Sequence, residues 1–397
     1  MFHLKKSPAA GSGRSPRPAG SARGGGFTRK VALGAAATLA LATAAQSGAS
    51  ATPVRPPAPA SAPATAPADD PAQWVMLGDS YTTGEFVGDP SPALDSPNRD
   101  GCDRTTGAYP SLVARRLAAH PPGDRPVKLT DVSCGGATID EVTTERQNPV
   151  SPVQTPKEGW PSVAPQVHRA PLSSRTDVVT IGAGGNSLPF SKMLVSCLTS
   201  GIGRSDEAAP CRDAYEANGP VFDPESIHDK YDRVSQEYVT MLRDVHKKAP
   251  EAKVITVGYP TIVPADPEVC DRADSSELTA NLQGVGRISV THGDIAWLNG
   301  VNNHLNAIIR ALTKLSGDTY VDIATPSVGH DACQPPGTKW VEGICGEAGP
   351  YWPQDLALGL VTLACSDDKR ATLVHPNSAG HAETAALVEA AVRDALK

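Results

Sequence analysis

Short apolar runs and longer stretches with helical spacing alternate along the chain from residue 73 to residue 397. Short apolar runs bounded by turn residues are typical of buried strands, and apolar residues three and four positions apart predict amphipathic helices. The predicted strands are 73–77, 127–132, 177–181, 253–257 and 319–323. The predicted helices are 109–119, 229–248, 294–315 and 378–396.

This alternation predicts an α/β fold in three layers, with a parallel sheet covered by helices on both faces. In such sheets, ligands bind beyond the carboxyl ends of the strands. Three predicted strands are followed there by the turns 78–80, 133–136 and 182–186. These turns contain serine, glycine and asparagine, which offer a nucleophile, close backbone approach and an amide donor. We therefore expect them to converge on one crevice.

The N-terminal segment has a different character. Residues 1–51 carry seven Lys or Arg and no Asp or Glu, with an apolar run at 31–45 and a small-residue site, Ala49-Ser50-Ala51. This pattern predicts a secretory signal peptide and hence a secreted, extracellular protein, while the export route stays open. Residues 52–72 are mostly Pro and Ala, which predicts a linker. Residues 73–397 then form one domain.

Charge narrows the range of partners. The chain has 36 Lys and Arg against 43 Asp and Glu, and loss of residues 1–51 leaves a net charge of −14. An acidic surface repels nucleic acid and anionic lipid, so neither is an expected partner. The run 31–45 is shorter than the about 20 apolar residues that span a bilayer, so stable membrane insertion is not expected. One sequence does not predict the oligomeric state.

The eight cysteines all lie in the predicted domain. None forms a C-x-x-C pair, so zinc or dithiol chemistry has little support, and we expect no metal and no cofactor. An even number of cysteines in an exported chain favours disulfides, but their pairing does not follow from sequence. They are Cys102, Cys134, Cys197, Cys211, Cys270, Cys333, Cys345 and Cys365.

Four residues could together hydrolyse an ester, a reaction that needs a nucleophile, a base and donors to the oxyanion. Ser80 directly follows the first strand and is the candidate nucleophile. His375, just before the last helix, is the candidate base. The backbone N–H groups of Ser80 and Gly136 and the side-chain amide of Asn186 are the candidate oxyanion donors.

The blocks around these residues resemble those of the SGNH (GDSL-like) hydrolases. The blocks are VMLGDSYTTGE, DVSCGGATIDE, TIGAGGNSLPF and TLVHPNSAGHAE. The resemblance implies a flavodoxin-like three-layer fold, a serine hydrolase acting on carboxylic esters, and small-molecule or lipid ester substrates. Block order, cysteine spacing and the stretch GHDAC at 329–333 are most similar to the secreted actinobacterial lipase/esterase branch. That branch implies the disulfides Cys102–Cys134, Cys197–Cys211, Cys270–Cys333 and Cys345–Cys365.

Two positions depart from the family pattern. Ser187 stands where the family usually has Asp, which affects a supporting hydrogen bond. Thr372 stands where many members have the Asp of a catalytic triad, three residues before the histidine. The resemblance implies that the main-chain carbonyl of Thr372 orients His375 instead. A carboxylate elsewhere is the alternative, with Asp367 and Asp368 nearest in sequence.

Other functions have less support. No G-x-S-x-G elbow occurs, which disfavours an α/β-hydrolase. Residues 182–185 do not complete a G-x-G-x-x-G motif, which disfavours a dinucleotide enzyme. His375 and His381 lie six residues apart, a spacing that does not place both on one helical face as metal ligands. His381 is therefore predicted to be structural. A non-catalytic member that binds a ligand in the same crevice is the alternative to an esterase. The sequence does not determine the acyl group of the substrate. The insertions 137–175 and 188–228 contain apolar residues that could form the wall of an acyl pocket or belong to the core. They are Trp160, Leu188, Phe190, Met193, Leu194 and Leu198.

Overall fold

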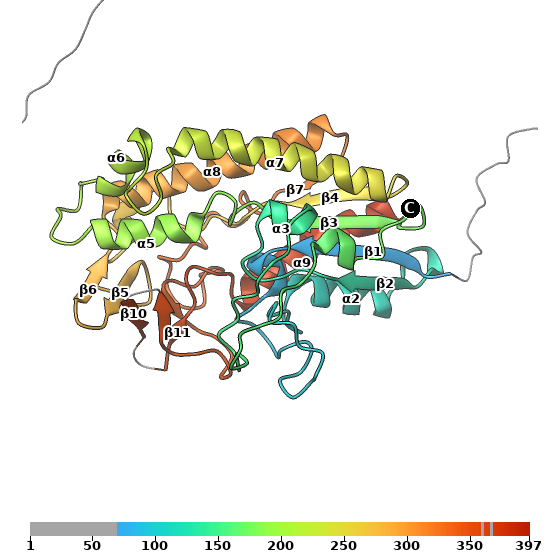
Figure 1. Cartoon of the computed structure of the whole chain (residues 1–397), viewed down its shortest axis with the longest axis horizontal. Coiled ribbons are helices and arrows are strands. Elements are labelled where there is room, and N and C mark those ends of the chain that lie inside the picture. Colours follow the sequence, from blue (N-terminus) through green and yellow to red (C-terminus); the bar gives the residue numbers. More distant parts are fainter. Residues whose placement is uncertain (1–69, 359–360, 366–367) are drawn as a thin grey trace, which may run out of the picture. The chain divides into compact units, whose positions relative to one another are not determined.

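A five-stranded parallel sheet lies at the centre of the molecule, in the order β2-β1-β3-β4-β7 (Figure 1). The computed structural model describes residues 70–358, 361–365 and 368–397, so the predicted signal peptide and linker residues 52–69 lie outside the described residues. All four neighbouring strand pairs are parallel, which confirms the predicted sheet. Its strands are β1 (Ala72–Gly78), β2 (Val127–Asp131), β3 (Val178–Gly182), β4 (Lys253–Val257) and β7 (Thr319–Val321).

Helices cover both faces of this sheet. On β1, Trp74 and Met76 point into one core with α2 (Tyr109–Ala119) and α9 (Ser378–Ala395). The alternate residues Val75 and Leu77 point into a second core with α7 (Ile227–Lys248) and α8 (His292–Leu315). Side chains that alternate along a strand serve both faces, so a fully buried strand is apolar throughout. Figure 1 shows the resulting three layers.

Capping residues set the starts of the two long helices. The side chain of Ser226 accepts the N–H of Asp229, and that of Thr291 accepts the N–H of Asp294. Both aspartates occupy the third helical position, where their charge is favourable beside the free N–H groups. The predicted starts at 229 and 294 were therefore two residues late in each helix.

Smaller elements surround the carboxyl edge of the sheet, and the sequence pattern did not predict them. An antiparallel sheet has the order β6-β5-β10-β9. Its strands are β5 (Thr279–Leu282), β6 (Gly286–Ser289), β9 (Leu356–Leu358) and β10 (Val361–Ala364), and a separate pair consists of β8 (Cys345–Gly346) and β11 (Arg370–Ala371). The short helices are α1 (Ser80–Thr83), α3 (Ile139–Thr143), α4 (Gln166–Arg169), α5 (Phe190–Ser200) and α6 (Pro210–Ala217).

Four disulfides join these surrounding segments to one another. Their pairing is the one that the family resemblance implies. No cysteine in the described part of the chain is free. The pairs are Cys102–Cys134, Cys197–Cys211, Cys270–Cys333 and Cys345–Cys365.

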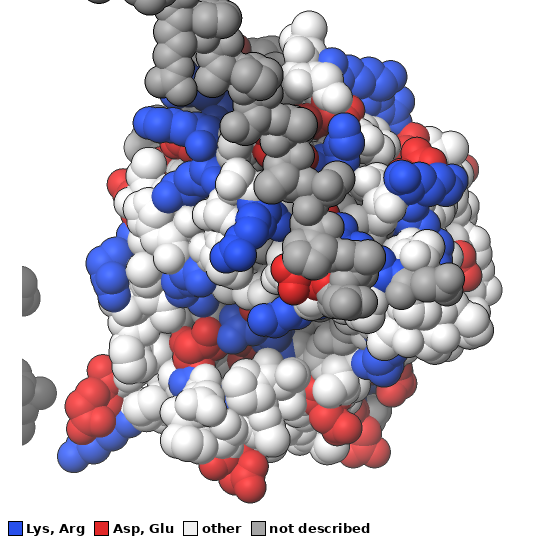
Figure 2. All heavy atoms as spheres, turned by 90° about the vertical axis from the view of Figure 1, so that its right-hand side faces the viewer, with Lys and Arg blue, Asp and Glu red and all other residues white. Residues whose placement is uncertain are grey.

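The outer surface carries charges of both signs. In Figure 2, the face at the right-hand side of Figure 1, Lys and Arg side chains are interspersed with Asp and Glu. The net negative charge is therefore not gathered on that face. Within the described ranges, no helix has the length and apolarity needed to cross a membrane.

We predict that reduction destabilises the folded domain. Each of the four disulfides restricts the unfolded chain and contributes ~2–4 kcal/mol. Thermal unfolding followed by circular dichroism should show a clearly lower midpoint with an excess of a phosphine reductant than without it. An unchanged midpoint after thorough reduction, or eight titratable thiols in the native protein as purified, would contradict this.

Candidate active site

The loops after β1, β2 and β3 meet at the carboxyl edge of the sheet. Since β1 lies between β2 and β3, the direction of winding reverses there, and ligand crevices form at such switch points. Ser80 is the first residue of α1, directly after β1, and Gly136 lies in the loop after β2. Asn186 lies four residues beyond the end of β3, and His375 three residues before α9.

The hydroxyl of Ser80 is hydrogen-bonded to the imidazole of His375. The Oγ–Nε2 distance is 2.8 Å, although the two residues are 295 positions apart in the chain. Both are about nine-tenths buried, with 8% of each residue exposed. When a hydroxyl donates a hydrogen bond to a ring nitrogen in this way, the nitrogen is placed to act as the base that activates the hydroxyl as a nucleophile.

Two backbone carbonyls orient the ring of His375. Its Nδ1 lies 2.9 Å from the Thr372 oxygen and 3.0 Å from the Leu373 oxygen, so Nδ1 carries the proton and Nε2 is free to accept. Burial lowers the pKa of His375 to about 4, against the opposing effect of these two carbonyls. Asp368 is exposed and does not contact the ring, while Asp367 lies outside the described residues.

The carbonyls point at the ring because the chain before it is held in an unusual conformation. Leu373 and Val374 both have left-handed backbones, with φ of 45° and 60°, which costs free energy for residues other than glycine. The N–H groups of Leu373 and Val374 donate to the oxygens of Ile344 and Gly343, at 3.1 and 2.9 Å. The hydroxyl of Tyr81 donates to the Val374 oxygen at 2.6 Å. These bonds fix the turn.

Asp79 and Tyr259 connect the serine loop with the asparagine loop. The carboxylate of Asp79 accepts the N–H of Tyr81 at 3.0 Å and the hydroxyl of Tyr259 at 2.5 Å. The same Tyr259 hydroxyl accepts the N–H of Gly185 at 2.7 Å. Burial raises the pKa of Asp79 to about 7, while these hydrogen bonds lower it. The chain of bonds fixes the residue before Ser80 relative to the residue before Asn186.

The three candidate oxyanion donors come from different loops. The side-chain amide of Asn186 donates one hydrogen to the Ala137 oxygen at 3.1 Å, which places it beside the loop of Gly136. Gly136 has a φ of +76°, a conformation that glycine adopts without strain. The N–H groups of Ser80 and Gly136 meet no hydrogen-bond acceptor in the described part of the chain. They remain available to a ligand oxygen.

Supporting bonds hold these loops in place. Ser187, at the position where the family usually has Asp, accepts the N–H of Ile139 at 2.9 Å and so ties the asparagine loop to the glycine loop. The side chain of Gln166 both accepts from and donates to the backbone of Gly78, at 2.8 Å each. Sequence reasoning missed Gln166 and Tyr259, because neither belongs to a motif and only the fold brings them to the site.

The structure also gives the positions of His381 and of the six apolar residues proposed for the acyl wall. His381 accepts the N–H of Tyr109 in the core, a structural position. Among the six apolar candidates, Phe190 lines the cavity that contains Ser80, Asn186 and His375. Leu194 and Leu198 line an adjoining cavity. Leu188 and Met193 are fully buried core residues, and Trp160 packs against Gly101 and Arg99.

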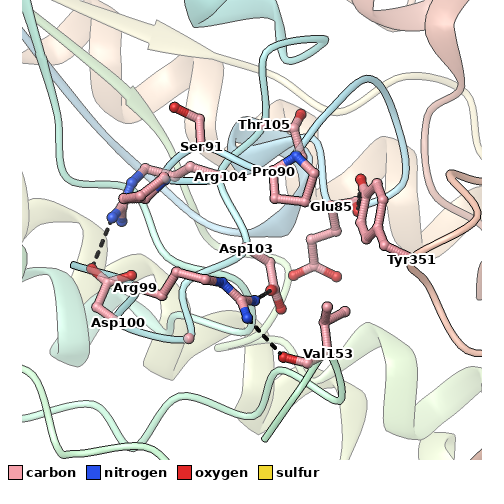
Figure 3. Close-up of a pocket in the computed structure, with 12 residues that line it drawn as sticks. Glu85, Pro90, Ser91, Arg99, Asp100, Asp103, Arg104, Thr105, Val153 and Tyr351 are labelled. Carbon is pink, nitrogen blue, oxygen red and sulfur yellow. Dashed lines mark hydrogen bonds and ion pairs between the residues drawn. The ribbon is translucent and has the colours of Figure 1, made fainter. Parts of the chain in front are cut away.

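A separate pocket is lined by charged side chains of the segment 85–105 and by Tyr351 (Figure 3). The carboxyl groups of Glu85 and Asp103 point into the same space there. Burial raises the pKa of Asp103 to about 6, and burial together with the charge of Asp103 raises the pKa of Glu85 well above its usual range. Neither residue lines the cavity of Ser80 and His375, so they are not positioned to act on an ester bound there.

A serine hydroxyl on a neutral histidine, beside free N–H groups at the carboxyl edge of a parallel sheet, is the arrangement of serine-type hydrolases. Comparison with known proteins specifies the family. The model of the GDSL-like lipase/acylhydrolase family matches residues 76–383. The chain belongs to this family and is a carboxylic ester hydrolase.

Several known proteins are similar to this chain. Lipase 2 of Streptomyces coelicolor is 32% identical over 274 residues, which cover 68% of this chain and 76% of that protein. An esterase of Streptomyces scabiei is 28% identical over 278 residues, which cover 65% of this chain and 72% of the esterase. The crystal structure of phospholipase A1 from Streptomyces albidoflavus is 20% identical and covers 82% of this chain and 100% of its own, with a TM-score of 0.49.

We predict that His375 is oriented by carbonyl groups and needs no carboxylate. Asp368→Ala and Asp367→Ala should each keep most of the wild-type kcat on a soluble ester, as should Thr372→Ala, because its backbone oxygen survives the substitution. Loss of a true triad carboxylate costs on the order of 10⁴-fold in turnover. A loss of that size in either aspartate variant, with the circular dichroism spectrum unchanged, would show that a Ser-His-Asp triad operates here.

Proposed function

We propose that this protein is a secreted esterase that forms an acyl-enzyme on Ser80, with His375 as the base. The observation that carries the proposal is the 2.8 Å hydrogen bond between Ser80 Oγ and His375 Nε2, at the carboxyl edge of the sheet. Names of relatives such as lipase and esterase support ester substrates.

In the acylation half of the reaction, His375 Nε2 takes the proton of the Ser80 hydroxyl as Oγ attacks the ester carbonyl carbon. The tetrahedral intermediate carries its charge on the former carbonyl oxygen. When it collapses, the imidazolium gives its proton to the departing alcohol oxygen, and the acyl group remains on Ser80. The Thr372 and Leu373 carbonyls keep the ring in the productive tautomer, and they stabilise the imidazolium less than a carboxylate would.

In the deacylation half, water takes the place of the alcohol. His375 accepts a proton from the water as its oxygen attacks the acyl carbon, and then returns that proton to Ser80 Oγ as the carboxylic acid leaves. In both halves, the N–H groups of Ser80 and Gly136 and the amide of Asn186 donate to the oxyanion. Such preorganised donors, placed where charge develops, contribute much of the catalysis.

The proposal includes export, with residues 1–51 as a signal peptide that is removed and residues 52–71 as a linker to the catalytic domain, one residue shorter than expected because Ala72 belongs to β1. Four disulfides without a free cysteine in the described ranges support it, because disulfides persist in oxidising compartments outside the cytosol.

We predict that Ser80→Ala lowers kcat on a soluble ester by at least ~10³-fold, because Ser80 is the nucleophile that contacts His375 Nε2 and no second one does so among the described residues. A fluorophosphonate probe should label the wild type and not this variant. Ser191→Ala is the matched control, since Ser191 lines the same cavity without contacting the base, and its labelling should persist. Near-wild-type turnover by a folded Ser80→Ala variant would reject Ser80 as the nucleophile.

The pH dependence of kcat/KM should reflect the buried base. His375 acts in its neutral form, and burial lowers its pKa to about 4, so the neutral form persists well below neutral pH. We expect kcat/KM to be flat from neutrality down to about pH 5 and to fall about tenfold per pH unit below the pKa. Enzyme held at each pH and assayed after return to neutrality separates titration from denaturation. An acid limb centred at or above the ordinary pKa of 6.5 would contradict this.

A further inference from the structure

The small pocket of Figure 3 lies beside the glycine loop, the segment after β2 that contains Gly136. Its volume is about 10 Å³, close to the least that holds one water molecule. The carboxyl groups of Glu85 and Asp103 are both directed into it. Glu85 follows Ser80 by only five residues in the chain. A facing pair of carboxyl groups therefore lies near the catalytic residues without taking part in the chemistry derived above.

The carboxyl group of Glu85 lies directly against the glycine loop. A methyl group added at Gly135 would clash with Oε1 of Glu85, so no side chain fits between the two residues. The backbone of Gly135 is already bonded elsewhere. Its N–H donates to the Cys102 oxygen at 3.0 Å, and its oxygen accepts from the Gln147 amide at 2.7 Å. Glu85 thus contacts the loop by packing, one residue before Gly136.

The segment that contains Asp103 is fixed to the same loop. The Cys102–Cys134 disulfide joins the segment to the loop. The carboxylate of Asp103 is held in turn by the hydroxyl of Ser151, which donates to it at 2.6 Å. Only 8% of the Asp103 side chain is exposed. Glu85, which comes from the serine loop, therefore faces a carboxylate that has little freedom to move away.

The arginines of the pocket are directed to other partners. Arg104 donates to Asp100 at 2.8 Å. Arg99 donates to a backbone oxygen at 3.1 Å and comes only to within 3.9 Å of Asp103. Among the described residues, no Lys or Arg forms an ion pair with Glu85. No cation is therefore placed to stabilise a negative charge on Glu85.

The other titratable groups around Glu85 are acidic or neutral. The hydroxyl of Tyr351 donates to the backbone oxygen of Glu85 at 3.1 Å and not to its carboxyl group. Burial, followed by the charges of Asp103 and Asp79, raises the pKa of Glu85 well above its usual range. Two carboxylates that share one site repel each other, so a neutral Glu85 opposite an ionised Asp103 is the favoured combination.

We propose that Glu85 is a positioning residue: its neutral carboxyl group packs on Gly135 and keeps the Gly136 N–H directed at the oxyanion, and ionisation of that group releases the loop. The inference rests on the proposed role of Gly136 as an oxyanion donor. An ionised Glu85 is repelled by Asp103 and lacks the hydration that a charge requires, so its side chain turns away from Gly135. Catalytic groups must be held to within about 0.5 Å, so a small shift of the loop weakens the donor.

The test is the alkaline side of the pH dependence of kcat on a soluble ester, with spontaneous hydrolysis subtracted. The folded protein holds the Glu85 proton more tightly than a free glutamate does. The turnover is therefore full while this proton is bound and falls as the pH rises through the raised pKa. Loss of one oxyanion donor costs ~10²–10³-fold in kcat, and we expect a displaced donor to cost at least ~10-fold. KM should change little, because the oxyanion exists only in the transition state and intermediate.

Substitutions at Glu85 separate its ionisation from its packing. Glu85→Ala removes the contact with the loop and should lower kcat already at neutral pH. Glu85→Gln should restore the neutral-pH turnover without the alkaline fall, because an amide has the shape of the neutral carboxyl group and does not ionise. Asp103→Asn removes a charge that opposes ionisation of Glu85, so the alkaline fall should move to lower pH. Glu145→Gln, at an exposed position after α3, is the matched control and should keep the wild-type profile.

Carbon-13 NMR of the glutamate carboxyl groups in the inactive Ser80→Ala variant measures the ionisation apart from the reaction. One signal should titrate well above the usual range of glutamate and should be missing when Glu85→Gln is added. An ordinary pKa for Glu85, an alkaline fall in Glu85→Gln at the wild-type pH, or a wild type without a fall up to about pH 10 would overturn the inference. Failure of the proposed mechanism is distinguishable, because near-wild-type turnover would then persist in Ser80→Ala.

Discussion

The turn of two left-handed residues before His375 is the constraint on which the rest of the site depends. Leu373 and Val374 hold backbone angles that cost free energy, and in return two carbonyl oxygens face Nδ1 of the imidazole. The proton is thereby kept on Nδ1, and Nε2 faces the Ser80 hydroxyl. A backbone acceptor thus does the orienting work that a side-chain carboxylate performs in a triad.

The neighbouring parts of the fold maintain that turn. Tyr81, one residue after Ser80, donates to the carbonyl of Val374, so the serine loop and the histidine loop hold each other. Tyr259 extends the connection from Asp79 to Gly185 and hence to the asparagine loop. The loops that carry Ser80, Asn186 and Tyr259 leave the same edge of the parallel sheet, while the histidine loop follows β11 and is held against them by these bonds.

The strong hydrophobic patterns made the sheet and its covering helices predictable. β4 and α2 have the bounds that were expected from the sequence. In each, the spacing of apolar residues stays that of one strand or one helix from the first residue to the last, and the pattern ends clearly on both sides. The antiparallel strands β5, β6, β9 and β10 were not predicted, since each has only three or four residues and their stability comes from pairing with distant segments. For the site, the four blocks identified Ser80 and His375 as partners, and the structure brings them together. Tyr259 and Gln166 act through contacts that exist only in the folded chain.

Nitrogen-15 NMR of the histidine side chains tests most directly whether the two carbonyls hold the His375 ring as described. In protein labelled at histidine, with the His375 signals assigned by their loss in His375→Gln, the neutral ring should carry its proton on Nδ1 and titrate with a pKa of about 4. The same ring in Asp368→Ala should give the same tautomer and pKa. A proton on Nε2 of the neutral ring, or a pKa at or above 6.5, would contradict the arrangement described for this enzyme.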